Sequence, residues 1–393
     1  MFSEFIKNQK EKETYIYSLN CSFKSYKTKK LYSDIVKYYS NKKICSIEEK
    51  LGKIKRSNLF LKMRNKEATV FYLGTDESQD KSGFLQSLQG FASVKYFTKN
   101  DGNYGQYNIK DGNCKDLNSA RIKELITDEY IKKNRKLDLF LMQTWAWRIK
   151  EDIFYFLKEA YPDIIIANIC MDDRHSYTNH GNWNSGTFGL IKYLDFSLVT
   201  SKECVEWYLK EGVPSFYFPE ASDKNIFHPY KENLNKKYQI GFVGACYGIR
   251  KKIVDSLISD GLEVKAYGNG WPSGRLDLDK TNEFYNDCEL ILGCGTIGHC
   301  SDFYALKLRD FDVPMSGAIY LTHDNDDLHE LFDINNEIFL AKGIKDFREK
   351  ARYILNLGVH EKQRIRDLAR KKSEKYHTYT FRLNNLIKEF LNE

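Results

Sequence analysis

Apolar runs alternate with amphipathic stretches from about residue 68 onward. In the first half of the chain, the apolar runs lie at 68–74, 92–97, 137–145, 164–171, 196–200 and 215–219. In the second half, they lie at 238–245, 263–267, 289–293, 318–322 and 337–341. Near-continuous apolar runs separated by helical segments are typical of parallel strands that helices cover on both faces. The pattern therefore predicts an α/β fold.

The alternation is interrupted once, and the interruption divides the chain. Between residues 223 and 237, Pro229 and several Asn and Lys residues replace the periodic pattern, as is typical of a linker. Helical patterns precede the first strand and follow the last one. We predict a helical extension 1–66, a doubly wound domain 67–222, a linker 223–237, a second doubly wound domain 238–376 and a terminal helix 377–393.

Charge is distributed unevenly along the chain, whose net charge is +7. Segment 1–66 has seventeen Lys or Arg against six Asp or Glu, a net of +11, whereas the remainder has 44 against 48, a net of −4. A basic, tyrosine-rich helical segment suits an anionic membrane surface or a partner protein, and a solvated helical cap is the alternative. No nucleic-acid-reading motif accompanies the charge, so nucleic acid is not an expected partner.

Composition indicates a reducing compartment. The chain has no run of eighteen apolar residues, and its first residues lack the pattern of a signal peptide. The nine cysteines are scattered, and the cluster of Cys288, Cys294 and Cys300 beside His299 has no zinc-site spacing, so we expect no metal. We therefore expect a cytoplasmic protein, with peripheral association at the inner membrane face as an option for the basic segment.

Candidate phosphate-binding residues follow strands of the second domain. Gly244 ends the first of these strands, and Arg250 lies in the first turn of the next helix, whose N-terminus can face an anion. A helix predicted near 303–312 carries Lys307, Arg309 and Asp312 ahead of a turn at Gly317. Lys and Arg suit a phosphate, and a carboxylate suits a sugar diol. These residues predict a nucleotide-sugar site, and a solvated helix face is the alternative.

Two glycine-rich segments add to this prediction. Tyr267, Gly268 and Asn269 follow a strand and are placed to line a base or sugar pocket. Residues 293–298 match G-x-G-x-x-G, which is typical of dinucleotide-binding enzymes and keeps an NAD(P)-dependent oxidoreductase as an alternative. Two strands of the same domain precede that motif, whereas the dinucleotide motif follows a first strand. We therefore favour a loop at Gly295 that lets a nucleotide approach the backbone.

The first domain carries its candidate chemistry after the run 164–171. Asp172, Asp173 and His175 follow this buried strand, where groups that orient an acceptor or move its proton belong. The alternative is a solvated loop in which Asp173 caps a short helix. Gly74, at the end of the first strand, lies on the same edge of the predicted sheet.

Taken in chain order, eight motifs resemble those of the CgeB-like (spore-maturation) glycosyltransferases, which are related to the group 1 glycosyltransferases. The motifs are DDRHSY at 172–177, FSLVTS at 196–201, YLKEGV at 208–213, NIFHP at 225–229, GFVGACYGIR at 241–250, AYGNGW at 266–271, LRDFDVPMSGAIYLT at 308–322 and HTYTFR at 377–382. The resemblance covers about residues 68–390. It implies the GT-B fold, in which two Rossmann-like domains face a cleft and the last helix returns to the first domain.

The resemblance also implies an activity. A metal-independent, hexosyltransferase-like enzyme would move a sugar from a nucleotide diphosphate donor, UDP-sugar by default, to a hydroxyl of a glycan, glycoconjugate or protein in polysaccharide biosynthesis. Arg250, Lys307 and Arg309 become diphosphate contacts, and Asp312 stands where the family has the Glu that binds the donor ribose. Tyr304 occupies the place of a second family Glu, which keeps a non-catalytic GT-B-like binding protein as an alternative. On the acceptor side, the implied groups are Gly74 and Asp172 for binding and Asp173 or His175 for catalysis.

Overall fold

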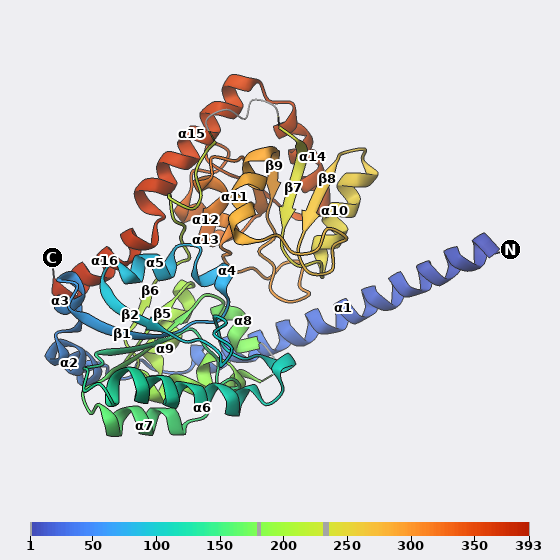
Figure 1. Cartoon of the computed structure of the whole chain (residues 1–393). Coiled ribbons are helices and arrows are strands. Elements are labelled where there is room, and N and C mark those ends of the chain that lie inside the picture. Colours follow the sequence, from blue (N-terminus) through green and yellow to red (C-terminus); the bar gives the residue numbers. More distant parts are fainter. Residues whose placement is uncertain (1, 179–181, 231–235, 393) are drawn as a thin grey trace.

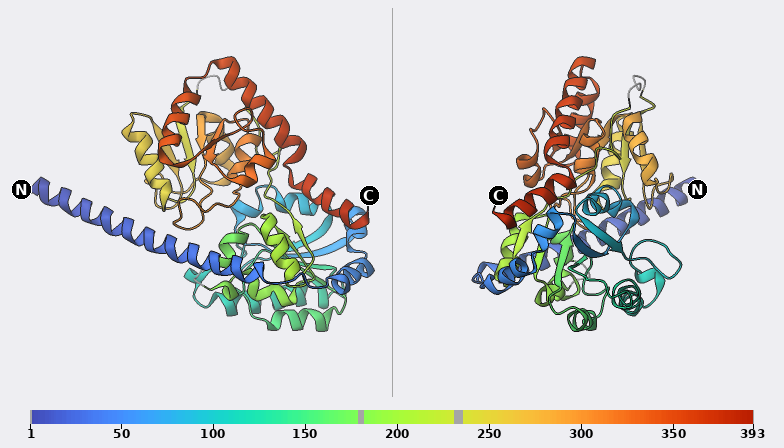
Figure 2. Two further views of the ribbon diagram at one scale, coloured as in Figure 1. Left: turned by 180° about the vertical axis from the view of Figure 1, so that it is seen from behind. Right: turned by 60° about the vertical axis from the view of Figure 1, so that its left-hand side comes forward.

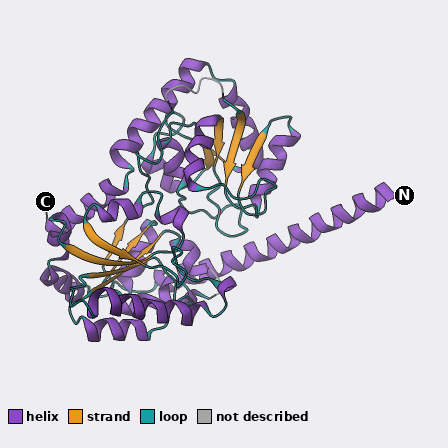
Figure 3. Ribbon diagram, viewed as in Figure 1, coloured by secondary structure: helices purple, strands orange, loops and turns teal. Residues whose placement is uncertain are grey.

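The computed structural model describes residues 2–178, 182–230 and 236–392, with side chains from residue 18 onward. It contains two α/β domains, each built on one sheet (Figures 1 and 3). The first sheet is parallel with strand order β2-β1-β3-β4-β5-β6. Its strands are β1 (Ala68–Leu73), β2 (Ala92–Tyr96), β3 (Leu139–Met142), β4 (Ile165–Cys170), β5 (Phe196–Val199) and β6 (Ser215–Tyr217).

Helices cover both faces of the first sheet, which explains its continuous apolar strands. On one face, Phe71 and Phe140 pack against α6, α7 and α9, and on the other face, Tyr72 and Leu141 pack against α3 and α5. The helices of this domain are α4 (Glu77–Asp80), α5 (Phe84–Gln89), α6 (Cys114–Ile126), α7 (Asp152–Ala160), α8 (Asp173–Thr178) and α9 (Lys202–Lys210). Between α8 and β5, residues Thr187–Tyr193 form a 3₁₀ helix.

The second sheet is also parallel, with order β11-β10-β9-β7-β8. Its strands are β7 (Tyr238–Val243), β8 (Val264–Tyr267), β9 (Cys288–Leu292), β10 (Tyr320–His323) and β11 (Phe339–Ala341). Its helices are α10 (Ile249–Ser259), α11 (Leu278–Asp287), α12 (Arg309–Met315), α13 (Asp326–Leu331), α14 (Gly343–Leu355) and α15 (Val359–Tyr376). Both sheets therefore have the doubly wound arrangement expected of Rossmann-like domains.

The basic segment 1–66 forms α1 (Phe2–Ser40), α2 (Glu48–Ser57) and α3 (Leu59–Arg64). The first part of α1 extends away from both domains (Figures 1 and 2). Its last turns are part of the first domain, since Ile35 and Tyr39 are buried in the core. Helices α2 and α3 also contribute core residues, so the packing of the first domain begins well before its first strand. No helix that the structure describes is long and apolar enough to cross a membrane.

The last helix, α16 (Tyr379–Leu391), leaves the second domain and packs on the first (Figure 1). Thr378 caps it, because the Thr378 side chain accepts a hydrogen bond from the N–H of Phe381. At its far end, the ring of Phe390 stacks on Phe60 with 3.8 Å between ring centroids. The two domains are thus connected by the linker and by this returning helix.

The helix predicted at 303–312 begins later than the sequence indicates. Helix α12 starts at Arg309, and Tyr304 instead makes an isolated antiparallel bridge with Thr296. The Asp310 carboxylate accepts a hydrogen bond of 2.7 Å from the N–H of Lys307, which holds the preceding chain at the entry to the helix. Lys307 therefore lies in the loop before α12, and only Arg309 and Asp312 of the predicted group lie within the helix.

Candidate functional site

The first-domain pocket lies beyond the carboxyl ends of β1, β3 and β4. It has a volume of 240 Å³ and includes Thr75, Thr144, Trp145, Arg148 and Asp172 in its lining. In doubly wound sheets, this edge is where ligands bind. The pocket thus occupies the position at which the sequence predicts an acceptor.

One ion pair joins this pocket to the second domain. The ammonium of Lys307 donates to the carboxylate of Asp172, and both side chains are partly exposed to solvent. Burial acts to raise the pKa of Asp172, but the neighbouring charges of Lys307 and His175 hold that pKa below its usual value. The structure therefore brings together two predicted residues, one from each side of the domain boundary.

Two arginines of the second domain converge on one carbonyl. Arg250 Nη2 donates to Cys294 O at 3.2 Å, and Arg309 Nη2 donates to the same oxygen at 3.3 Å. Neither guanidinium is paired with a carboxylate in the described part of the chain, and both Nε atoms are buried without a hydrogen-bond partner there. An unused N–H donor on a buried cation is costly unless a ligand uses it. This pair is consequently a candidate anion site.

Glycine makes the close approach at this site possible. Gly244 has φ of 156°, and a Cβ added to it would lie 3.0 Å from Arg309 Nη1. Gly268 has φ of 135°, and an added Cβ would collide with the Gly244 carbonyl. The next residue, Asn269, accepts a backbone hydrogen bond of 2.8 Å from Cys246. The turns after β7 and β8 are therefore folded onto each other beside Arg309, which places Gly244, Tyr267, Gly268 and Asn269 in one cluster.

Two further glycines differ in their placement. Gly295 follows β9 on the same edge of the sheet, and its carbonyl accepts a hydrogen bond of 2.9 Å from the N–H of Ala305. Gly317 lies at the opposite edge, before β10, where an added Cβ would come 2.8 Å from Pro229 Cγ. The seven-residue helix α12 separates Gly317 from Arg309 by about 10 Å. Gly317, predicted as a donor contact, is therefore not part of the cluster around Arg309, and it lies against Pro229 of the linker.

The two carboxylates of α12 have different surroundings. Asp310 uses both oxygens, since Oδ1 accepts from the Tyr320 hydroxyl and Oδ2 from the Lys307 N–H, each at 2.7 Å. Asp312 is 5 % exposed, and its Oδ1 has no hydrogen-bond partner among the described residues. Burial raises the pKa of Asp312 well above its usual value. Asp312 is thus the carboxyl group of this pair whose hydrogen-bonding capacity is left unfilled by the described residues.

Glu220 is a candidate that the sequence pattern did not single out. It follows β6, is 3 % exposed, and has a buried Oε2 without a partner in the described structure. Burial raises its pKa well above the usual value, against the opposing charge of Lys307, and the charges of Asp172 and Asp310 raise it further. Its position three residues after β6 was the available signal.

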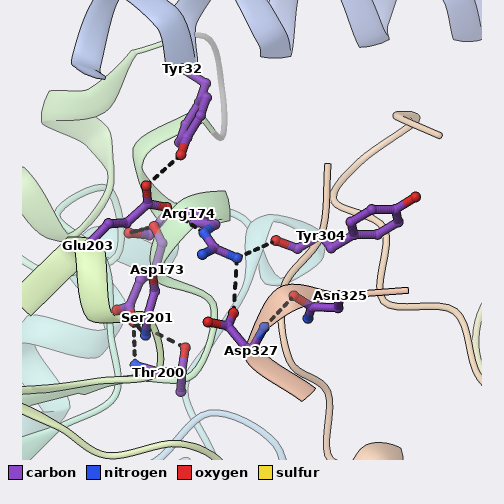
Figure 4. A network of polar contacts seen from close by, with 10 residues as sticks. Tyr32, Asp173, Arg174, Thr200, Ser201, Glu203, Tyr304, Asn325 and Asp327 are labelled. Atoms are coloured by element: carbon purple, nitrogen blue, oxygen red, sulfur yellow. Dashed lines mark hydrogen bonds and ion pairs between the residues drawn. The ribbon is translucent and has the colours of Figure 1, made fainter. Parts of the chain in front are cut away.

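The structure does not support the predicted catalytic role of Asp173. This carboxylate is 1 % exposed, and its Oδ2 accepts hydrogen bonds from the Thr200 hydroxyl and the Ser201 N–H at 3.1 and 3.2 Å (Figure 4). It fixes the start of α8 to the loop after β5, so it acts as a positioning residue. His175 is half-buried, and its ring lies 5.8 Å from that of Trp145. His175 therefore remains the candidate beside the first-domain pocket.

Asp173 is expected to make stability depend on pH. Burial, opposed by hydrogen bonds, raises its pKa from 3.8 to about 7. Between these values, the folded state holds a proton that the unfolded state has lost. The free energy of unfolding should therefore fall by roughly a few kcal/mol as the pH rises from about 4 to about 7. Asp173→Asn should flatten this slope in urea unfolding measured at several pH values, whereas the exposed control Asp163→Asn should not. An unchanged slope in Asp173→Asn would contradict the assignment.

Arg174 connects the domains from the same helix (Figure 4). It forms an ion pair with Glu203 of the first domain and another, at 3.1 Å, with Asp327 of the second. It also donates to the carbonyl of Tyr304 at 2.9 Å. The Tyr32 hydroxyl of α1 donates to Glu203 at 2.6 Å, which brings the basic segment into the same network. This network fixes the relative position of the two halves of the candidate site.

Comparisons with solved structures identify the fold. Sucrose-phosphate synthase from Thermosynechococcus elongatus superposes with a TM-score of 0.60 at 8 % identity, over 83 % of this chain and 98 % of that chain. HepE from Anabaena, in complex with UDP-glucose, superposes with a TM-score of 0.56 at 10 % identity, over 82 % of this chain and 99 % of that chain. The chain has the GT-B fold.

The sequence comparison covers part of this GT-B chain. Residues 250–388, most of the second domain and the returning helix, match the model of the family described as glycosyl transferase-like. No curated protein matches the sequence. A protein described as a UDP-N-acetylglucosamine 2-epimerase from Listeria monocytogenes superposes with a TM-score of 0.50 at 12 % identity, over 84 % of this chain and 98 % of that chain. The fold therefore occurs with more than one described chemistry, and the function has to be argued from the site.

Proposed function

We propose that this GT-B protein is a glycosyltransferase that moves a sugar from a nucleotide diphosphate donor to an acceptor hydroxyl. The observation that carries the proposal is the second-domain cluster. Arg250 and Arg309 meet at one carbonyl with their Nε–H donors unused, and Asp312, one helical turn after Arg309, has an unpartnered carboxyl oxygen. Two guanidinium groups suit a diphosphate, and a carboxyl group suits a ribose diol. The family match over residues 250–388 and the UDP-glucose bound by HepE support a nucleotide sugar, with UDP as the proposed nucleotide.

In this proposal, the donor lies on the second domain with its diphosphate at the start of α10. Arg250 and Arg309 bind the phosphates, and negative charge that builds on the leaving phosphate as the glycosidic bond breaks is stabilised there. Lys307, paired with Asp172, is close enough to the boundary to exchange this partner for a phosphate oxygen. These cations supply the charge that a metal provides elsewhere, so we propose a metal-independent reaction with no cofactor.

The acceptor hydroxyl is proposed to enter from the first-domain pocket. His175, beside Trp145 and Asp172, is the group proposed to hold the transferred sugar or to take the acceptor proton. A leaving phosphate oxygen can take that proton instead if the reaction retains configuration. We further propose a CgeB-like hexosyltransferase that acts on a glycan, glycoconjugate or protein, with the basic segment 1–66 as its contact to an anionic membrane face.

A panel of nucleotide sugars tests the proposal. UDP-, GDP- and ADP-sugars are each added to the purified protein, and both the melting temperature and the release of nucleotide diphosphate are measured. We expect UDP and at least one UDP-sugar to raise the melting temperature, because a ligand that binds only the folded state stabilises it. Stabilisation by NAD(P) without any response to the panel would favour the oxidoreductase alternative. Nucleotide binding without hydrolysis or transfer would favour the non-catalytic one.

A further inference from the structure

Arg148 is a shielded cation without a counter-charge in the first-domain pocket. It lies in the loop after β3 and lines the pocket, and its Nε is buried without a hydrogen-bond partner. Its guanidinium lies over the ring of Trp147, 4.8 Å from the ring centroid, and forms no ion pair within the described chain. Burial lowers the pKa of Arg148, and the Cys114 thiol is the neighbouring group that opposes this effect. A shielded cation of this kind is destabilising unless a ligand uses it.

The loop that carries Arg148 is held in place by the core of the domain. The backbone carbonyl of Arg148 accepts a hydrogen bond of 3.0 Å from Asn118, a fully buried residue of α6. The adjacent Lys150 N–H donates to the Ser119 hydroxyl at 2.8 Å, and the Trp147 N–H donates to the Ser185 carbonyl at 3.0 Å. Because the backbone of this loop is already ordered, ligand binding to the Arg148 guanidinium costs little additional conformational entropy.

The carboxylates of the same pocket are engaged elsewhere. Asp172 is paired with Lys307 of the second domain. Asp76 caps α4, because its Oδ1 accepts a hydrogen bond of 3.0 Å from the Ser78 N–H. The pocket is therefore lined by a positive charge that no carboxylate neutralises among the described residues, by the ring of Trp145 and by several polar side chains. Its volume suits a single sugar ring.

We propose that the first-domain pocket binds an acceptor sugar that carries an anionic group, a carboxylate or a phosphate, and that Arg148 binds this group. The identification of the occupant as the acceptor rests on the proposed function. A planar guanidinium with its Nε–H unused can bind a carboxylate or phosphate through two parallel hydrogen bonds. Arg148 would then determine which acceptors bind, while the reacting hydroxyl faces His175 and the donor half of the cleft.

Binding of three monosaccharides tests the proposal without requiring turnover. D-Glucuronate, D-glucose 6-phosphate and D-glucose are titrated into the full-length protein by calorimetry at constant ionic strength, with and without UDP. We expect at least one anionic sugar to bind at least tenfold more tightly than glucose. Arg148→Met should remove this difference, since a hydrogen-bonded charge pair contributes about 10-fold to 100-fold in affinity. Arg148→Lys should restore part of it, and the exposed control Arg135→Met should behave as the wild type.

The outcomes separate this proposal from the glycosyltransferase assignment. Equal affinity for the three sugars, or a preference that survives Arg148→Met, would overturn the anionic acceptor while leaving donor binding intact. If sodium sulfate binds wild type and Arg148→Met equally, and as tightly as the anionic sugars do, the binding is non-specific anion binding. That result would also overturn the proposal. Preferential binding that depends on Arg148 supports the site even if the nucleotide panel is negative. The unliganded Arg148→Met variant should keep or raise its melting temperature, because no carboxylate loses a partner.

Discussion

Replacing Asp312 with Ala is expected to weaken UDP binding about 10-fold to 100-fold, because removing one partner of a buried hydrogen bond costs about 1–3 kcal/mol. The substitution removes the buried carboxyl group whose Oδ1 has no hydrogen-bond partner among the described residues. In the proposed complex, this group binds the ribose hydroxyls. Calorimetric titration of UDP into wild type and Asp312→Ala measures the loss directly.

A deoxynucleotide makes the Asp312 experiment specific. The wild type should bind UDP more tightly than 2′-deoxy-UDP, and Asp312→Ala should bind the two with similar affinity, because the group that recognises the 2′-hydroxyl is gone. Asp326→Ala is the matched control, since Asp326 is exposed in the first turn of another short helix. Undiminished discrimination in Asp312→Ala would contradict the ribose contact.

Replacing Arg309 with Met is expected to lower kcat about 100-fold to 1000-fold, as loss of one preorganised group that stabilises developing charge does elsewhere. The same variant should keep or raise its melting temperature, because Met removes a buried, incompletely paired charge and retains most of the packing on Phe242. The distinctive expectation is that Arg309→Met lowers kcat while it keeps or raises the melting temperature. Measuring kcat on the UDP-sugar identified by the panel, together with thermal unfolding, tests both.

Two further variants define the role of Arg309. Arg309→Lys retains the charge but not the planar fork, so it should recover only part of the activity. Arg275→Met removes an exposed arginine of the same domain and should change neither quantity. A large fall in melting temperature with Arg309→Met would indicate that the guanidinium mainly supports the fold, and full activity would exclude it from the diphosphate site.

The fold follows from the sequence because its strands are buried on both faces. Each apolar run overlaps one strand, and the central strands β3, β4 and β5 are buried at every position. Short helices were harder to locate. The entry to α12 depends on the Asp310 carboxylate bound to the Lys307 N–H, and α8 begins at a carboxylate bound to a distant loop. Such tertiary hydrogen bonds leave no periodic pattern for a sequence to show.

The site was predictable where position after a strand was informative, and less so where burial decides the role. Gly244 and Arg309 come together as the motif order suggests. Asp173 has the expected position after a strand, but it is buried, and its Oδ2 accepts hydrogen bonds from the loop after β5. Glu220 and Arg148 were missed because their relevant property is the lack of a partner in a shielded environment, which depends on the surrounding fold.

Helix α1 is attached to both domains. Its Tyr32 is hydrogen-bonded to Glu203 in the first domain, and Lys29, less than one turn away, is paired with Asp302 in the second. A hinge rotation would change the separation of these two attachment points, whereas a continuous helix keeps its own side chains at nearly fixed spacing. Opening must therefore break one attachment or move the helix as a whole. The long N-terminal part of α1 would then act as a lever, and a load on it would bias the protein between open and closed forms.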